Sequence, residues 1–262
     1  MGRIVETVED GRTILAAVFA QASDLVALTG AGISTESGVP DFRSPGSPWR
    51  RYPPIDFASF LASPDTRVEA WRRKFAMDDI YAGAGPSRTH RALTQLHRAG
   101  PLSLVVTQNI DGLHQAAGLP EDSLVELHGN GTFARCLSCG ERHALVTVRA
   151  ALERDGTAPT CRCGGMVKSA TIAFGQTLPA AALDRAVRAT RACDVFLVLG
   201  SSLVVRPAAT LPRLAAEAGA TLVIVNREPT PLDEQADAVV RADVGSVLAP
   251  WALNGKIPSA AA

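Results

Sequence analysis

The sequence has no net charge, almost no lysine and no long hydrophobic run. Its 262 residues contain 26 Lys+Arg and 26 Asp+Glu, and only three of the basic residues are lysines. This balance gives no electrostatic reason to expect binding to nucleic acid or to an anionic membrane surface. Every apolar run is well short of the roughly 20 residues that a membrane-spanning helix needs. We therefore expect neither nucleic acid nor a membrane as a partner.

Cysteine is also scarce, with five in the whole chain, which excludes a small secreted scaffold held together by disulfides. The apolar segment 13–20 has the look of an export signal, but Glu6, Glu9 and Asp10 precede it where such a signal carries positive charge. The same segment fits one face of a helix. We therefore expect an N-terminal helix and a cytoplasmic protein.

Apolar residues make up 47% of the chain, which excludes a disordered protein and allows a large core. Short apolar runs have the pattern of buried parallel strands, at 24–29, 102–107, 194–199, 221–225 and 238–240. Alanine-rich helical stretches lie between them, at 89–99, 179–192 and 207–219. This alternation predicts an α/β fold with a doubly wound, parallel, Rossmann-like sheet. Ligands of such sheets bind at the carboxyl ends of the strands.

Four clustered cysteines give the strongest metal signal. Cys136 and Cys139 are separated by two residues, and Cys161 and Cys163 by one. Four thiolates on two tight turns are typical of tetrahedral Zn²⁺ without an open position for water. We therefore predict one structural zinc ion in a small separate module. The alternative is a set of unpaired core cysteines, which is how we interpret Cys193.

A glycine loop, residues 30–34, follows the first predicted strand. Glycine lets the backbone approach a pyrophosphate, and a helix N-terminus after the loop would offer free N–H groups to the anion. The third glycine of the dinucleotide fingerprint and an acidic residue about 20 positions on are both missing. Taken alone, the loop is more often a tight turn.

Asp41, Phe42 and Arg43 follow the glycine loop. An aromatic face beside a guanidinium can cover a cationic, aromatic ligand and grip its phosphate. The alternative is a loop with a salt bridge.

Polar residues also follow the second predicted strand, in the run TQNIDGLH at 107–114. Such side chains either orient an amide-bearing ligand or cap the next helix. His128 lies beside a glycine where the cysteine module begins, and a histidine pKa near neutrality suits a general base. A single histidine is nevertheless more often structural.

Together these motifs resemble the sirtuins, the NAD-dependent protein deacylases, of bacterial type. The resemblance covers residues 10–250 approximately, and its motifs appear in the family's order. They are the four cysteines and the runs GAGISTESGVPDFRS (30–44), TQNIDGLH (107–114), ELHG (126–129), FG (174–175), GSSLVVRPA (200–208) and VN (225–226).

The resemblance implies that NAD⁺ is a co-substrate in the removal of acyl groups from protein lysines, giving nicotinamide, O-acyl-ADP-ribose and free lysine. It implies a catalytic set of His128, as the base, with Asn109 and Asp111. The further cofactor-binding residues that it implies are Gly30, Ala31, Gly32, Ser34, Asp41, Phe42, Arg43, Gln108, Ile110, Gly200, Ser201, Ser202, Asn226, Arg227, Glu228 and Val244. The acylated peptide would add a strand along an edge formed by Ile172, Phe174, Gly175 and Val204.

The resemblance also suggests how the chain is divided. A Rossmann-like NAD-binding domain is expected from 1–43, 86–130 and 171–255, with an entrance loop and helical insertion at 44–85, a zinc-binding module at 131–170 and a flexible tail at 256–262. We expect a monomer that acts on acylated lysine proteins or peptides.

Two features bear on the acyl group. Sirtuins that remove acidic acyl groups carry a Tyr-x-x-Arg pair, and the matching run EAWRR (69–73) has no tyrosine at the required place, although Arg72 or Arg73 can still point into the channel. The region 51–76 resembles the class II branch instead, which implies longer or unusual acyl groups. Gln176 stands where many members have glutamate.

Three other functions compete with deacylation. A protein mono-ADP-ribosyltransferase would use the same NAD site and end on a protein acceptor. An inactive NAD-binding module would not need the complete catalytic set. A dehydrogenase is disfavoured because the third glycine and the ribose-binding acid are missing.

Overall fold

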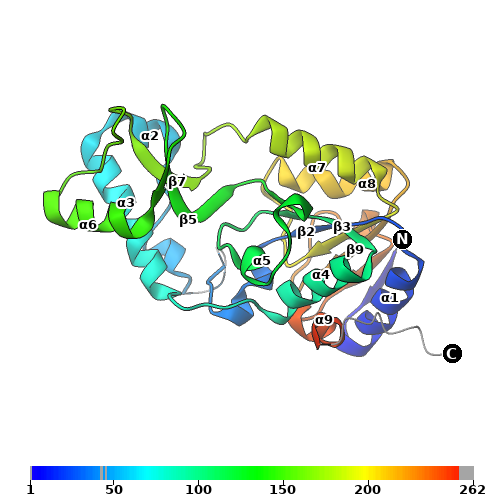
Figure 1. The fold of residues 1–262 in the computed structure, drawn as a ribbon. Helices are drawn as coiled ribbons and strands as arrows, with labels where there is room; N and C mark the ends of the chain where they lie inside the picture. Colours follow the sequence, from blue (N-terminus) through cyan, green and yellow to red (C-terminus); the bar gives the residue numbers. More distant parts are fainter. Residues whose placement is uncertain (1, 42–43, 45, 254–262) are drawn as a thin grey trace.

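The computed structural model describes residues 2–41, 44 and 46–253. Phe42 and Arg43, which the sequence predicts at the cofactor, lie outside these described residues. A seven-stranded sheet forms the larger lobe of the molecule and a three-stranded sheet the smaller one (Figure 1). The predicted α/β fold with a smaller cysteine-bearing module is confirmed.

All neighbouring strands of the large sheet are parallel, in the order β1-β10-β9-β8-β2-β3-β4. They are β1 (Arg3–Val5), β2 (Leu25–Thr29), β3 (Leu102–Thr107), β4 (Leu124–Glu126), β8 (Val195–Leu199), β9 (Thr221–Val225) and β10 (Ala238–Val240). The five expected strands are present, and the two that sequence reasoning missed, β1 and β4, are three-residue strands at the edges. The chain runs outward from β2 to β3 and, on the other side, from β8 to β9. The β2/β8 boundary is therefore the switch point at which doubly wound sheets bind ligands.

Helices cover both faces of this sheet (Figure 1). Alternate side chains of β2 point to opposite faces, as the two-residue period of a strand requires. The covering helices are α1 (Val8–Gln21), α4 (Arg88–Ala99), α7 (Ala180–Ala192), α8 (Leu211–Glu217) and α9 (Val244–Leu253), and α5 (Leu113–Ala116) lies beyond the end of β3. Leu25 and Ala27 pack with α1, α4 and α9, whereas Val26 and Leu28 pack with α7 and α8.

The smaller lobe is an antiparallel sheet in the order β6-β5-β7, covered by helices. Its elements are β5 (Gly129–Cys136), β6 (Arg142–Ala144), β7 (Val167–Thr171), α2 (Phe57–Ala62), α3 (Pro64–Ile80) and α6 (Leu145–Asp155). Ser63 caps α3 by accepting the N–H of Thr66, and Pro64 fits the first turn. Trp71 and Phe75 of α3 stack at 5.5 Å and share a buried core with Cys136 of β5. Helix α3 therefore supports the cysteine module.

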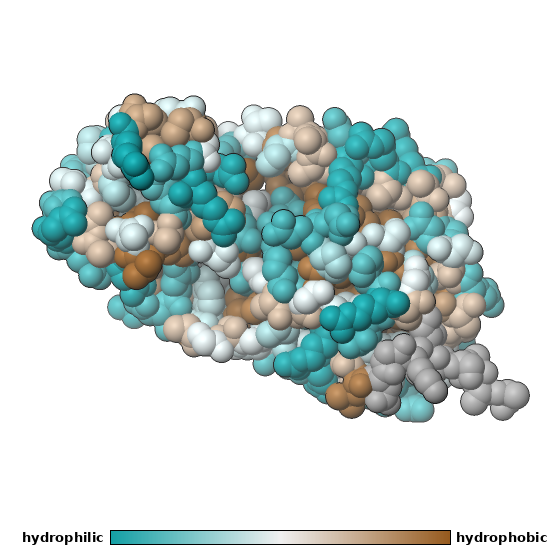
Figure 2. Space-filling view, in the orientation of Figure 1, coloured by the Kyte–Doolittle hydropathy of each residue, from teal (hydrophilic) through white to brown (hydrophobic). Residues whose placement is uncertain are grey.

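The surface shows hydrophilic side chains over most of the face in Figure 2, with hydrophobic ones visible between them in its middle part. Within the described residues, no helix combines the length and the apolar character needed to cross a membrane.

Candidate active site

The glycine loop does not lead into an α-helix, so that expectation is wrong. Two single 3-10 turns follow β2, Ala31–Ile33 and Thr35–Ser37. The second ends at Gly38, whose left-handed conformation (φ +83°) stops the turn. The N–H groups near this loop therefore belong to short turns and not to a helix start.

The loops after β2 and β8 touch through their backbones. The Gly30 N–H donates to the Leu199 carbonyl (3.0 Å) and the Gly32 N–H to the Gly200 carbonyl (2.9 Å). A Cβ atom on Gly32 would lie 2.8 Å from the Gly200 Cα, and Gly200 itself has φ +60°. Only glycines allow this approach. Ala31 and Ser34 on one side and Ser201 and Ser202 on the other are thereby brought to one edge of the sheet.

A hydrogen-bonded cluster lies beside this contact. The side-chain amide of Asn109 donates to the Gly30 carbonyl and to the Ser34 hydroxyl oxygen, both at 3.1 Å. The Ser34 hydroxyl donates in turn to the Asp111 carboxylate at 2.7 Å. Between Asn109 and Asp111, the Ile110 carbonyl accepts the N–H of Gly131 at 2.7 Å. The structure therefore joins Asn109 and Asp111, which follow β3, to the loop that follows β2.

His128 is held in one tautomer. Its Nδ1 lies 3.0 Å from the Gln108 carbonyl oxygen, and a carbonyl can only accept, so Nδ1 carries the proton and Nε2 keeps a lone pair. Burial lowers the pKa of His128, although the bond to the Gln108 carbonyl opposes this shift. The same Gln108 donates its side-chain amide to the Ser201 hydroxyl oxygen at 2.8 Å. The imidazole is thus a neutral group able to accept a proton at Nε2.

The predicted adenosine contacts lie in the loop after β9 and at the first residue of α9. The Asn226 side-chain amide donates to the Glu228 carbonyl (2.7 Å), and Arg227 pairs with Asp243 (2.6 Å). The Val244 side chain is buried in the core, so a ligand can meet only its backbone. On the other side of the site, the Asp41 carboxylate accepts the N–H and the hydroxyl of Ser44.

The predicted peptide edge follows β7 and bends into a turn at Phe174 and Gly175. The Ile172 N–H donates to the His128 carbonyl at 2.7 Å, which ties this edge to the histidine. Gln176 holds both backbone groups of Ala173, because its side chain accepts the Ala173 N–H (3.1 Å) and its own N–H donates to the Ala173 carbonyl (3.0 Å). Gly175 beside it has φ +79°. Phe174 and Val204 are large apolar side chains left 59% and 53% exposed.

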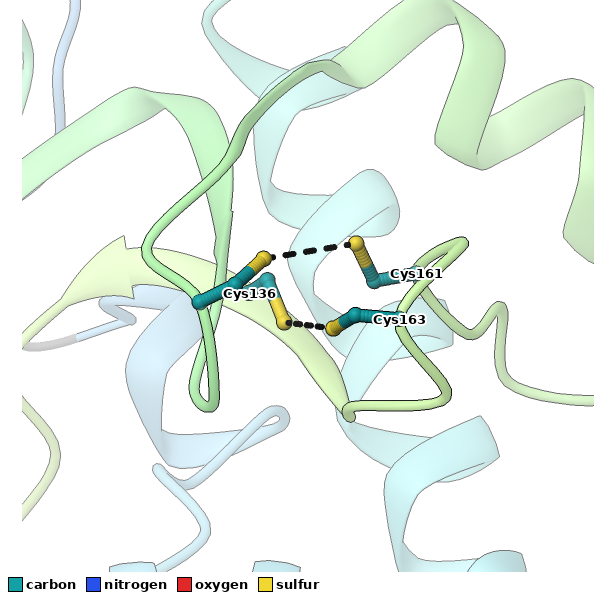
Figure 3. A group of neighbouring side chains, drawn as sticks. Cys136, Cys161 and Cys163 are labelled. Atoms are coloured by element: carbon teal, nitrogen blue, oxygen red, sulfur yellow. Dashed lines mark hydrogen bonds between the residues drawn. The ribbon is translucent and has the colours of Figure 1, made fainter.

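The four module cysteines point toward one another, as the sequence predicts (Figure 3). Their sulfur atoms all lie within 4.8 Å of one another, and two pairs are separated by 3.5 and 3.7 Å. Zn–S bonds of about 2.3 Å in a tetrahedron place sulfur atoms about 3.8 Å apart. The donor set therefore fits one structural zinc ion. Cys193 is a buried core residue elsewhere, as expected.

Glu126 is a further polar group of this region that sequence reasoning left without a role. One of its oxygens accepts the side-chain amides of Gln115 (2.9 Å) and Asn130 (2.8 Å). Burial raises the pKa of its carboxyl group. Glu126 belongs to the ELHG run of the sequence, but a single carboxylate in that run does not reveal that α5 and β5 supply its hydrogen-bond partners.

Comparison with known proteins agrees with this geometry. The Sir2 family matches residues 30–207. The chain is 53% identical over 252 residues to an NAD-dependent protein deacetylase of Rhodopseudomonas palustris, covering 96% of this chain and 100% of that protein. It is 40% identical to NAD-dependent protein deacylase 2 of Pyrobaculum aerophilum, with 89% and 92% covered. A solved structure of Sir2 with a deacetylated p53 peptide and 3′-O-acetyl ADP-ribose matches with a TM-score of 0.80 at 35% identity, over 91% of this chain and 94% of that one. The chain therefore belongs to the Sir2 family of NAD-dependent protein deacetylases and deacylases.

Proposed function

We propose that deacylation of protein lysines takes place at the β2/β8 edge, with His128 as the general base. The observation that carries this proposal is the fixed tautomer of His128, whose Nδ1 donates to the Gln108 carbonyl. The Nε2 lone pair is then available to take a proton from a ribose hydroxyl, and the lowered pKa of His128 keeps the ring neutral near pH 7.

The residues around His128 supply the binding site for NAD⁺ in this proposal. The nucleotide, when bound, would supply an electrophilic ribose carbon, at which the acyl oxygen would replace nicotinamide. Asn109 and Asp111 face its carboxamide with an amide and a carboxylate, and their bonds to Ser34 and Gly30 fix their positions. The remaining predicted contacts follow strands β2, β3, β8 and β9 and are Gly30, Ala31, Gly32, Ser34, Gln108, Ile110, Gly200, Ser201, Ser202, Asn226, Arg227 and Glu228, with Asp41 and the backbone of Val244.

The acylated peptide is proposed to pair with the segment Ile172–Gly175. Within the described residues, neither the Ile172 carbonyl nor the Phe174 N–H has a hydrogen-bond partner, so both are available to the backbone of a bound peptide. Phe174 and Val204 would flank that peptide with apolar surface. Solved Sir2 structures with a p53 peptide and NAD⁺ and with a propionylated peptide support a peptide as the partner.

The preferred acyl group is proposed not to be acidic, because the tyrosine of the Tyr-x-x-Arg pair is missing, and the resemblance of residues 51–76 to the class II branch implies a longer or unusual acyl group. Arg73 is held by Glu69 (2.7 Å) and by the Pro53 carbonyl (2.8 Å), which leaves it poorly placed to bind an acidic acyl chain. A competition assay with lysine peptides bearing acetyl, longer aliphatic and succinyl chains tests this. Preference for the succinyl peptide would contradict it.

The division of the chain made from the sequence is also proposed for the folded protein. The helices α2 and α3 fall in the insertion 44–85, and the short sheet β5–β7 falls close to the module 131–170. A monomeric state and a cytoplasmic location stay predictions.

His128→Ala tests the proposed base. We expect turnover to fall by about a hundredfold or more, because general base catalysis contributes on that scale, while calorimetry still detects NAD⁺ binding. Retention of most of the turnover would contradict the assignment. Label from NAD⁺ found bound to protein, with no free O-acyl-ADP-ribose, would favour the mono-ADP-ribosyltransferase alternative.

A further inference from the structure

Two buried histidine rings meet behind the proposed nicotinamide site. His90 lies in the first turn of α4 and His114 in α5, and their centroids are 4.7 Å apart in an edge-on arrangement. The rings are 0% and 2% exposed, so neither reaches solvent. Neither has a role in the chemistry proposed above.

His114 is linked to the Asn109 backbone by two threonine hydroxyls. Its Nε2 lies 3.0 Å from the Thr29 hydroxyl oxygen, and Thr29 lies 2.8 Å from the Thr107 hydroxyl oxygen. Thr107 accepts the backbone N–H of Asn109 at 3.0 Å. This chain of bonds runs across the ends of β2 and β3 to the residue whose side chain contacts Gly30 and Ser34.

His90 contacts His114 through its ring only and is itself bonded at the start of α4. The Ser87 N–H donates to its Nδ1 at 3.2 Å, and the Ser87 hydroxyl oxygen lies 2.7 Å from the same atom. Because a backbone N–H can only donate, the neutral His90 ring carries its proton on Nε2. Burial and the nearby Arg91 lower the pKa of His90 to about 3. Burial and His90 likewise lower the pKa of His114 to about 3, against the opposing charge of Asp111.

The second nitrogen of each ring has no hydrogen-bond partner within the described part of the chain. These atoms are His90 Nε2 and His114 Nδ1. A buried polar atom without a partner costs free energy, and an apolar side chain would avoid that cost. The imidazoles are therefore better explained by the bonds that their other nitrogens make than by packing.

We propose that His90 and His114 are positioning residues that hold Asn109, and with it Asp111, in place for the nicotinamide end of NAD⁺. The proposal rests on the function proposed above. It predicts that loss of the link weakens the use of NAD⁺ without weakening the use of the peptide, because the proposed peptide edge, which follows β7, bonds to the backbone of His128 and not to this chain of hydroxyls.

Two substitutions of His114 distinguish the effect of the hydrogen bond to Thr29 from the effect of the imidazole ring itself. His114→Gln can keep a hydrogen-bond donor near the Nε2 position. The shorter side chain of His114→Asn reaches only the Nδ1 position, so it loses the hydrogen bond to Thr29. Thr29→Val removes the same link from its other end with little change in shape. His97→Asn is the matched control, because His97 lies on α4, the helix that carries His90, and contacts the Leu102 carbonyl (2.9 Å) outside the network.

We expect kcat/KM for NAD⁺ to fall about tenfold in His114→Asn and in Thr29→Val, as the loss of one buried hydrogen bond allows. The KM for the peptide should stay at the wild-type value, His114→Gln should restore most of the loss, and the double variant should lose no more than either single one. His97→Asn should match the wild type in both constants. If His114→Asn does not fold, Thr29→Val carries the test alone.

A fall in kcat/KM for NAD⁺ of less than about twofold in Thr29→Val, or a rise in the peptide KM as large as the fall for NAD⁺, would overturn the proposal. Calorimetric titration of NAD⁺ into the same variants separates this failure from that of the proposed function. A wild-type protein that binds NAD⁺ but releases no nicotinamide refutes the function, while weaker NAD⁺ binding by Thr29→Val still supports the network.

Discussion

At the scale of single residues, the site depends on which donor and acceptor atoms already have a hydrogen-bond partner within the protein. The Gln108 carbonyl engages one nitrogen of His128 and thereby decides which nitrogen can act as a base. Ser34 lies between Asn109 and Asp111, and its hydroxyl donates only to Asp111. An amide and a carboxylate are thus presented side by side with fixed polarity, which suits recognition of a carboxamide.

The pH profile of turnover tests the state of His128. A base acts only when neutral, and burial lowers the pKa of His128 below its ordinary value of 6.5. The kcat measured in short assays should therefore decline as the pH falls, with a midpoint below 6.5. A decline with a midpoint above 6.5 would mean that the folded protein favours the charged ring, contrary to its burial.

At the scale of elements, the small lobe depends on its metal site. Cys136 and Cys161 belong to the same buried core as Trp71, Val148 and Val167. Without zinc, the small lobe would keep only a three-stranded sheet with a small core, and a unit of this size buries too little apolar surface to be stable without a metal or a similar crosslink. The cysteine cluster therefore stabilises the surface that leads into the peptide edge.

Cys136→Ala tests that dependence. Structural zinc sites contribute about 10 kcal/mol or more of folding free energy, so loss of one ligand should abolish hydrogen-exchange protection in β5 and β7 and leave β2 and β8 protected. Elemental analysis should find one zinc ion per wild-type chain and almost none in the variant. Cys193→Ala, a buried cysteine outside the cluster, is the control and should keep its zinc. Full protection of β5 in a zinc-free Cys136→Ala protein would contradict the role.

At the scale of the whole molecule, the site exists because two distant loops meet at the switch point of the sheet. The contact between Gly32 and Gly200 brings together the ends of β2 and β8, and Asn109 joins them from β3. Residues separated by most of the sequence thereby share one edge. This arrangement follows from strand order, which no single motif encodes.

Gly32→Ala tests the loop contact. Its new Cβ would lie 2.8 Å from the Gly200 Cα and 2.9 Å from the Gly200 carbonyl oxygen, so the loops must separate. We expect NAD⁺ affinity measured by calorimetry to fall at least about tenfold, as loss of one or more buried contacts would cause. Gly85→Ala is the control, because a Cβ there meets nothing within 4 Å. Equal affinities for the two variants would contradict the account.

The sequence predicted those parts of the molecule that local patterns specify. Strands such as β2 and β8 are uninterrupted apolar runs that end in glycine, and the cysteine spacing alone indicated the metal site. The strands β1 and β4 were missed because three residues are too few to show a period. The turns after Gly30 were predicted as a helix start, although Gly38 and Pro40 follow too closely for one. The contact between His90 and His114 arises only from the packing of α4 against α5, so sequence reasoning assigned neither ring a role, although His114 ends the TQNIDGLH run.

One measurement tests the central claim most directly: nicotinamide released from NAD⁺ by the purified protein, quantified by chromatography with an acetylated peptide and with the same peptide unmodified. The account predicts one nicotinamide for each lysine freed, and almost none with the unmodified peptide. Lysine freed without nicotinamide, or equal release with both peptides, would contradict it.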